Sequence, residues 1–200
     1  MNEFENDRDV YSAIRFEGLD SSQRKIHGKE FDECTFYECN FSDTEFDQCK
    51  FVDCHFLKCN LSVVKIARCK FLDVVFEQCK IIGVDWTTAA WSTLVLHAPI
   101  KFYQCTMNDS SFFGLKMEGV VMESCKSHEV DFREGNFSDA KFSHTDFSNS
   151  LFGHTNLTGA DFTDAINYNI DIHFNEIKRA KFCRYEAVRL LNSLDIELVD

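Results

Sequence analysis

A large apolar residue returns at every fifth position along most of the chain, and phenylalanine occupies many of these sites. The unbroken run comprises Phe31, Phe36, Phe41, Phe46, Phe51, Phe56, Leu61, Ile66, Phe71, Phe76, Ile81 and Trp86. Two positions before each of them from Phe36 onward lies a small or apolar residue, most often cysteine. A fixed short period indicates a repeat architecture, in which each unit buries its apolar side against its neighbours.

A five-residue period fits neither a helix nor a straight strand. Around an α-helix it would rotate successive apolar positions by about 140°, so no apolar stripe would form. In a straight strand an odd period would place successive phenylalanines on opposite faces. The pattern works if the chain turns a corner once per repeat, because the small and the large residue then share one inward side. Coils of this kind stack through backbone ladders about 4.8 Å apart.

The period continues beyond Trp86 after one interruption. One extra residue enters around positions 97–99, and the period resumes at Phe102 and runs to Phe182. Pro99 lies at this slip, where a residue without an N–H group is tolerated. If four corners close a coil, as the resemblance described below implies, the repeats make about eight coils of roughly twenty residues. We therefore predict a single all-β domain with an N-terminal cap over 1–25, a repeat body over 26–183 and a C-terminal segment over 184–200.

The C-terminal segment departs from the repeat. Residues 186–194 predict a short amphipathic helix, and the tail after them alternates like a strand. The segment could simply cap the last coil. However, it offers more apolar surface than capping needs, so we predict a homodimer formed through a two-fold contact. The residues predicted to form this interface are Leu190, Leu191, Leu194 and Ile196.

The ten cysteines follow the repeat rather than a metal-binding or disulfide pattern. Nine of them occupy the small inward position, so we predict buried, free thiols. The sequence shows neither an export signal nor an apolar run of membrane length, which together with free thiols favours the cytoplasm. It also lacks a nucleophile–base pair, a phosphate-binding glycine loop and a cofactor fingerprint. We predict a protein that is not an enzyme and needs no cofactor or metal.

The net charge of −12 opposes direct binding of nucleic acid, because duplex affinity comes largely from cations that neutralise phosphates. With twenty residues per coil, Glu33, Asp53 and Asp73 stack in one column, and a one-residue slip extends this column to Glu134. Stacked like charges are mildly destabilising. We therefore predict a partner-binding surface, with solubility as the alternative. Duplex DNA carries one charge per about 1.7 Å, so the column is at most a partial mimic.

The repeats resemble those of the pentapeptide-repeat proteins, whose consensus is a small residue, Asp or Asn, then Leu or Phe. Residues 159–162 and 139–142 show this consensus well. Three stretches outside the generic repeat, 83–91, 167–182 and 186–198, are similar to the albicidin-resistance group, which protects DNA gyrase.

The resemblance implies a right-handed quadrilateral β-helix that dimerises through its C-terminal segment. It also implies that the protein binds DNA gyrase and protects this type II topoisomerase from a poison such as albicidin. Quinolone-resistance relatives carry sizeable loops, and a slip of one residue therefore favours albicidin-type protection. The alternative is a drug-sequestering or scaffolding module with an unrelated protein partner.

Overall fold

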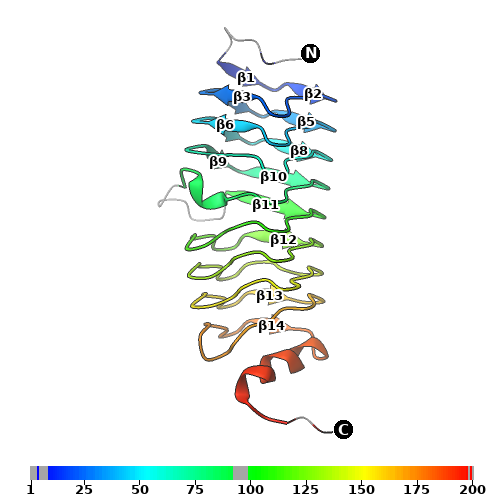
Figure 1. Cartoon of the computed structure of the whole chain (residues 1–200), viewed down its shortest axis with the longest axis vertical. Helices are drawn as coiled ribbons and strands as arrows, with labels where there is room; N and C mark the ends of the chain where they lie inside the picture. The colour runs from blue at the N-terminus through cyan, green and yellow to red at the C-terminus, as the bar shows by residue number, and fades with distance from the viewer. Residues whose placement is uncertain (1–3, 5–8, 92–98, 198, 200) are drawn as a thin grey trace.

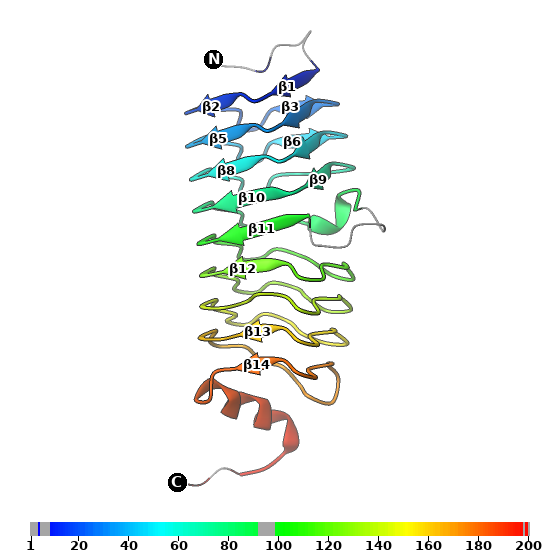
Figure 2. The ribbon, with the colours of Figure 1, turned by 180° about the vertical axis from the view of Figure 1, so that it is seen from behind.

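Each repeat forms a short extended rung whose central residue points inward. In strand β5, for example, Phe36 is buried while its neighbours Thr35 and Tyr37 are partly exposed. The computed structural model describes residue 4, residues 9–91, residues 99–197 and residue 199. In both views the coils form one elongated stack with the two chain ends at opposite ends (Figures 1 and 2). The predicted all-β solenoid is confirmed.

The coil has four faces, which we call A to D in chain order. Face A is a parallel sheet of β1 (Val10–Ser12), β4 (Glu30–Asp32), β7 (Lys50–Val52) and β9 (Lys70–Leu72). Face B contains β2 (Arg15–Glu17), β5 (Thr35–Tyr37), β8 (His55–Leu57), β10 (Val74–Glu77), β11 (Ile100–Tyr103) and β12 (Val121–Glu123), and continues through β13 (Asp161–Phe162) and β14 (Lys181–Phe182). Every strand pair is parallel, as stacked coils require.

Faces C and D consist mainly of isolated bridges. Face C is one ladder through eight coils, formed by Asp20, Asn40, Asn60, Lys80, Thr106, Lys126, Asp146 and Ile166. Face D contains β3 (Lys25–His27), β6 (Glu45–Asp47) and the short helix η1 (Trp86–Thr88). Eight successive rungs on one face confirm the predicted number of coils.

The corners are made by residues in the left-handed region. Glu33, Asp53 and Asp73 have φ of 52°, 49° and 50°. The N–H of such a residue donates to a carbonyl of the following coil, as from Asp53 to Leu72 at 2.9 Å. A left-handed residue after each inward phenylalanine is what turns the chain, and this turn is why the period is five.

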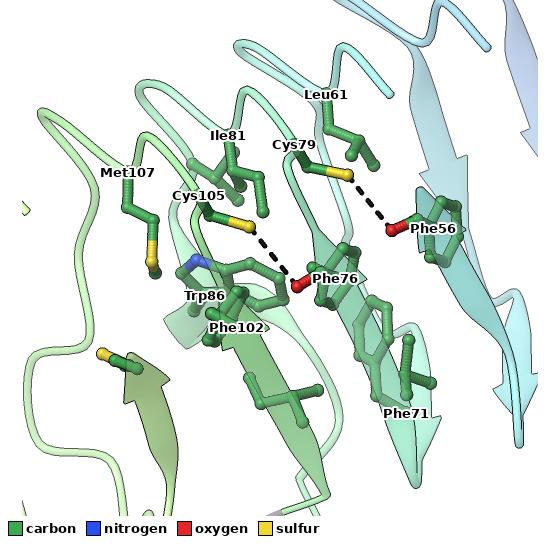
Figure 3. Close-up of a cluster of buried hydrophobic side chains, with 14 of the residues drawn as sticks. Phe56, Leu61, Phe71, Phe76, Cys79, Ile81, Trp86, Phe102, Cys105 and Met107 are labelled. Carbon is green, nitrogen blue, oxygen red and sulfur yellow. Dashed lines mark hydrogen bonds between the residues drawn. The ribbon is translucent and has the colours of Figure 1, made fainter. Parts of the chain in front are cut away.

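The interior is a set of stacked side-chain columns. Behind face B, the ring centroid of Phe56 lies 4.5 Å from that of Phe36 and 5.0 Å from that of Phe76, and the rings are nearly parallel. The buried cysteines line the same interior. Cys79 donates a hydrogen bond from its thiol to the carbonyl of Phe56, one coil back (Figure 3). Aromatic stacking and thiol hydrogen bonds therefore repeat with the coil itself.

The register across the interruption differs from the expected slip. Val74 pairs with Ile100, a step of 26 residues, whereas other strand pairs such as Phe51 with Phe71 step by 20. Six residues are therefore added, not one, and most of the positions concerned, 92–98, lie outside the described residues. Five of the six added residues equal one full repeat and leave the five-residue period unchanged. Only the sixth is therefore visible in the sequence, as a slip of one position.

The two ends also refine the expected boundaries. Strands β1 and β2 already pair with the next coil, so regular rungs begin at Val10, inside the segment expected to form a cap. Phe4 lies 5.3 Å from both Phe16 and Phe31, over the open end of the core. At the other end the predicted helix is present as η2 (Glu186–Leu194). The tail forms no strand among the residues described there, which are 195–197 and 199.

Candidate partner-binding surface

Three carboxylates stand one above another at the corner between faces A and B. Glu33, Asp53 and Asp73 each occupy the left-handed position that follows a face A rung, and each is exposed. We call these three residues the acidic corner. Among the described residues Glu33 and Asp53 form no ion pair, and Asp73 has only Lys101 at 3.9 Å. The acidic corner is therefore a column of negative charge with little internal compensation.

Glu134, which the sequence analysis places in the same column, lies on a different corner. Its N–H donates to Gly153, and the N–H of Gly114 donates to Arg133 one coil earlier, so Glu134 follows a face D rung. The added residues explain the error. With a step of 26, the position above Asp73 is Pro99, and the column continues through Gly119 to Asp139.

Several other charges on the walls are paired between neighbouring coils. Lys50 lies 2.7 Å from Glu30, and Lys181 lies 3.0 Å from Asp161. Hydrogen bonds from Arg68 and His27 lower the pKa of Asp47, against a smaller upward effect of desolvation. These pairs cancel charge locally, whereas Glu33 and Asp53 of the acidic corner have no such partner among the described residues.

The cysteine thiols form no candidate metal-binding site within the described residues. Nine cysteines are buried, and Cys183 is the exception, being partly exposed. Burial raises the pKa of Cys79 and Cys105 far above the usual thiol value, so both stay protonated and donate to carbonyls. Within the described ranges no group of three His, Cys, Asp or Glu side chains could hold a metal ion. The predicted structural role of the nine inward cysteines agrees with this placement.

The C-terminal helix presents its apolar residues in two directions. Leu190 is partly buried and packs against the last coil of the core. Leu194 and Ile196 remain 36% and 54% exposed, and Leu191 is half-buried. Of the four predicted interface residues, Leu190 therefore caps this chain, while Leu194 and Ile196 are available to a partner.

A polar network fastens this helix to the coil. Arg189 donates to Glu186 at 2.7 Å and to Asn167 at 3.1 Å, and Asn167 donates to Asp146 at 2.9 Å. Asp146 also lies 2.9 Å from His128 on the same face. The sequence does not predict this network, although Asn167 interrupts the apolar period and so marks the place where a polar contact replaces a core residue.

Asp146 is the electrostatic centre of that network. Desolvation favours its protonated form, but hydrogen bonds from Asn167, Ser148 and His128 outweigh desolvation and lower the pKa of Asp146 to about 2. Beside the network, burial raises the pKa of Tyr168 to about 12. Near neutral pH the carboxylate of Asp146 is therefore ionised and the phenol of Tyr168 is neutral.

Comparison with known proteins identifies the repeat. The model of the pentapeptide repeat region matches residues 29–98 and 95–162. The chain belongs to the pentapeptide-repeat family. In this pentapeptide-repeat protein the matched region covers the acidic corner but not η2. None of the helices among the described residues is long and apolar enough to cross a bilayer.

The chain is similar to solved structures, and the first of the two below shows a shared fold. A trypsin-treated form of QnrB1, a plasmid-mediated fluoroquinolone resistance protein, is 22% identical with a TM-score of 0.50, covering 96% of this chain and 92% of QnrB1. HetL, a pentapeptide repeat protein involved in heterocyst differentiation regulation from the cyanobacterium Nostoc, is 10% identical with a TM-score of 0.41, covering 87% of each chain. No curated protein matches the chain. At these identities the likeness concerns the fold alone.

Proposed function

We propose that this pentapeptide-repeat protein binds DNA gyrase as a partial DNA mimic and protects the enzyme from a topoisomerase poison such as albicidin. The observation that carries the proposal is the acidic corner. Three carboxylates repeat with the coil on one edge, and their mutual repulsion serves no purpose in a purely structural rod. A basic groove that normally holds DNA would relieve that repulsion and gain favourable charge contacts.

The family resemblance supports the same proposal. The expected likeness to the albicidin-resistance group supplies gyrase as the partner, and the solved relative QnrB1 is described as a resistance protein. The added residues between β10 and β11 number six, so the argument from a one-residue slip against quinolone protection loses its basis. Both drug classes therefore belong in the test.

A homodimer joined at the C-terminal helix completes the proposal. Leu194 at the end of the helix and Ile196 just after it are exposed, while Leu190 packs against the coil, and two such segments would cover each other's apolar surface. A dimer of this kind would double the length of the rod. The protein would act in the cytoplasm, where its free thiols stay reduced, without catalysis and without direct contact with nucleic acid.

The test is a supercoiling assay with purified gyrase and either albicidin or a quinolone. The variant Asp53→Lys/Asp73→Lys reverses two charges of the acidic corner, and Lys58 shows that such a left-handed corner accepts lysine. The control Asp109→Lys/Glu129→Lys makes the same change at two exposed left-handed positions on another corner. We expect the native protein and the control to restore supercoiling, and the first variant to lose this activity.

Two outcomes would contradict the proposal. Native protein that neither rescues gyrase from either drug nor inhibits it at high concentration would rule out gyrase protection. Equal loss in both variants would show that net charge, and not the acidic corner, determines binding. Calorimetric titration of free drug against the protein separates gyrase protection, which predicts no direct drug affinity, from drug sequestration.

A further inference from the structure

At several ladder positions, charges of opposite sign face each other on neighbouring coils. Lys25, Glu45 and Lys65 follow one another on face D, and Lys141, Asp161 and Lys181 do so on face B. On face C, Lys126 pairs with Asp146. Directly opposite residues in a sheet are close enough for their charges to interact, so this alternation stabilises the stack.

One ladder pair breaks the rule among the described residues. On face A, Lys50 of β7 lies in register with Lys70 of β9, and no other paired or bridged position places two like charges together. Lys50 is neutralised from below by Glu30, at 2.7 Å. Lys70 is exposed and has no ion-pair partner within the described part of the chain.

A third cation stands beside this pair. Arg68 occupies the left-handed corner two residues before Lys70, and its guanidinium is 2.6 Å from Asp47. These three cations line a cleft of about 320 Å³ that runs along the corner between faces D and A, past Gln48 and Glu30. Lys29, which lies 3.2 Å from Asp9, is a fourth cation in the lining. This volume is at the lower end of that of small-molecule sites. In a chain of net charge −12, the cleft concentrates positive charge.

We propose that this cleft binds a small phosphate-bearing anion. Two lysines in register can share one doubly charged group, whereas a single carboxylate would neutralise only one of them. Such a ligand bridges Lys50 and Lys70 and converts the one repulsive ladder pair into a favourable contact. Arg68, already oriented by Asp47, adds a planar donor group at the side of the cleft. The site is separate from the acidic corner, which lies at the opposite edge of face A.

The experiment measures binding of sodium pyrophosphate by calorimetry and by thermal shift, with sodium chloride at matched ionic strength as the reference. A second arm uses a nucleoside triphosphate without metal, so that a nucleotide preference is distinguished from binding of the phosphates alone. The variant is Lys70→Ser. The matched control is Lys80→Ser, because Lys80 occupies the equivalent ladder position on face C and faces the neutral Asn60 and Thr106.

We expect saturable binding to the native protein, affinity within twofold of native for Lys80→Ser, and a loss of about tenfold or more for Lys70→Ser, which removes a charge-assisted hydrogen bond. A third variant, Lys70→Glu, places an opposite charge in register with Lys50. It should melt at a higher temperature than the native protein without anion, and should no longer respond to pyrophosphate. The proposal is overturned if sodium chloride gives the same thermal shift, or if Lys70→Ser binds as tightly as Lys80→Ser.

Discussion

Replacing Phe56 with alanine should destabilise the coil by about 4 kcal/mol, in the range for large-to-small changes in protein cores. Phe56 is 1% exposed, and its ring lies 4.5 Å from that of Phe36 and 5.0 Å from that of Phe76. Burial of a phenylalanine contributes about 2–3 kcal/mol, and each stacked pair adds about 0.5–1.5 kcal/mol.

The surroundings of Phe56 limit how far the cavity left by this substitution can close. The Cys79 thiol donates to the carbonyl of Phe56 at 3.3 Å, and the backbone on both sides is fixed by ladders to the neighbouring coils. A site that cannot collapse retains its cavity, which adds to the transfer term. The loss of stability in Phe56→Ala should therefore lie near the middle of the range for such core substitutions and not at its lower end.

The assay is urea unfolding followed by circular dichroism, with Phe113→Ala as the control. Phe113 loses the same atoms but is 45% exposed on face D, so its truncation should cost less than about 1 kcal/mol. A difference between the two variants of less than about 1 kcal/mol would refute the reasoning, because the aromatic columns would then contribute little beyond surface phenylalanines.

Three further predictions concern the thiols, the polar network and the C-terminal helix. A thiol reagent should modify one cysteine per native chain, Cys183, and all ten after unfolding, and rapid modification of several thiols in the native state would contradict the buried placement. The pKa of Asp146 is lowered from 3.8 to about 2, so its ionised form stabilises the fold above about pH 4, and this stabilisation is lost as the pH falls towards 2. With 27% of its side chain exposed, ionised Asp146 contributes about 2 kcal/mol to the free energy of unfolding. In unfolding titrations, Asp146→Asn should therefore remove the loss of stability that this carboxylate causes in acid. Leu194→Arg/Ile196→Arg should give a folded monomer in sedimentation experiments, whereas Leu190→Arg should lower stability, and an unchanged dimer in the first variant would exclude this interface.

The repeat itself was readable from the sequence because its period is set by geometry. A left-handed corner after each inward residue requires five residues per side, so Phe31 to Trp86 define the coil without reference to distant contacts. The inward cysteines follow for the same reason. The column Glu33, Asp53 and Asp73 was also predictable, since all three precede the interruption and are separated by whole coils.

For residues after the interruption, the corner that each occupies was not predictable in the same way. Six added residues preserve the five-residue period except for one position, so the pattern cannot reveal how many residues separate successive rungs of one face. For this reason Glu134 was assigned to the wrong corner. The network of Asp146, Asn167 and Arg189 was missed on different grounds, because it joins residues about twenty apart through side chains that carry no periodic signal.

At the left-handed corners the fold restricts the backbone conformation but not the identity of the exposed side chain. A corner demands only a residue that accepts φ near 50°, as Glu33, Asp53 and Val63 all do with φ of 52°, 49° and 53°. Asparagine visits this region more readily than glutamate or valine, so exchanging a corner carboxylate for asparagine deletes the charge without loosening the turn. Related sequences can therefore diverge in what they recognise while their aromatic interior stays the same.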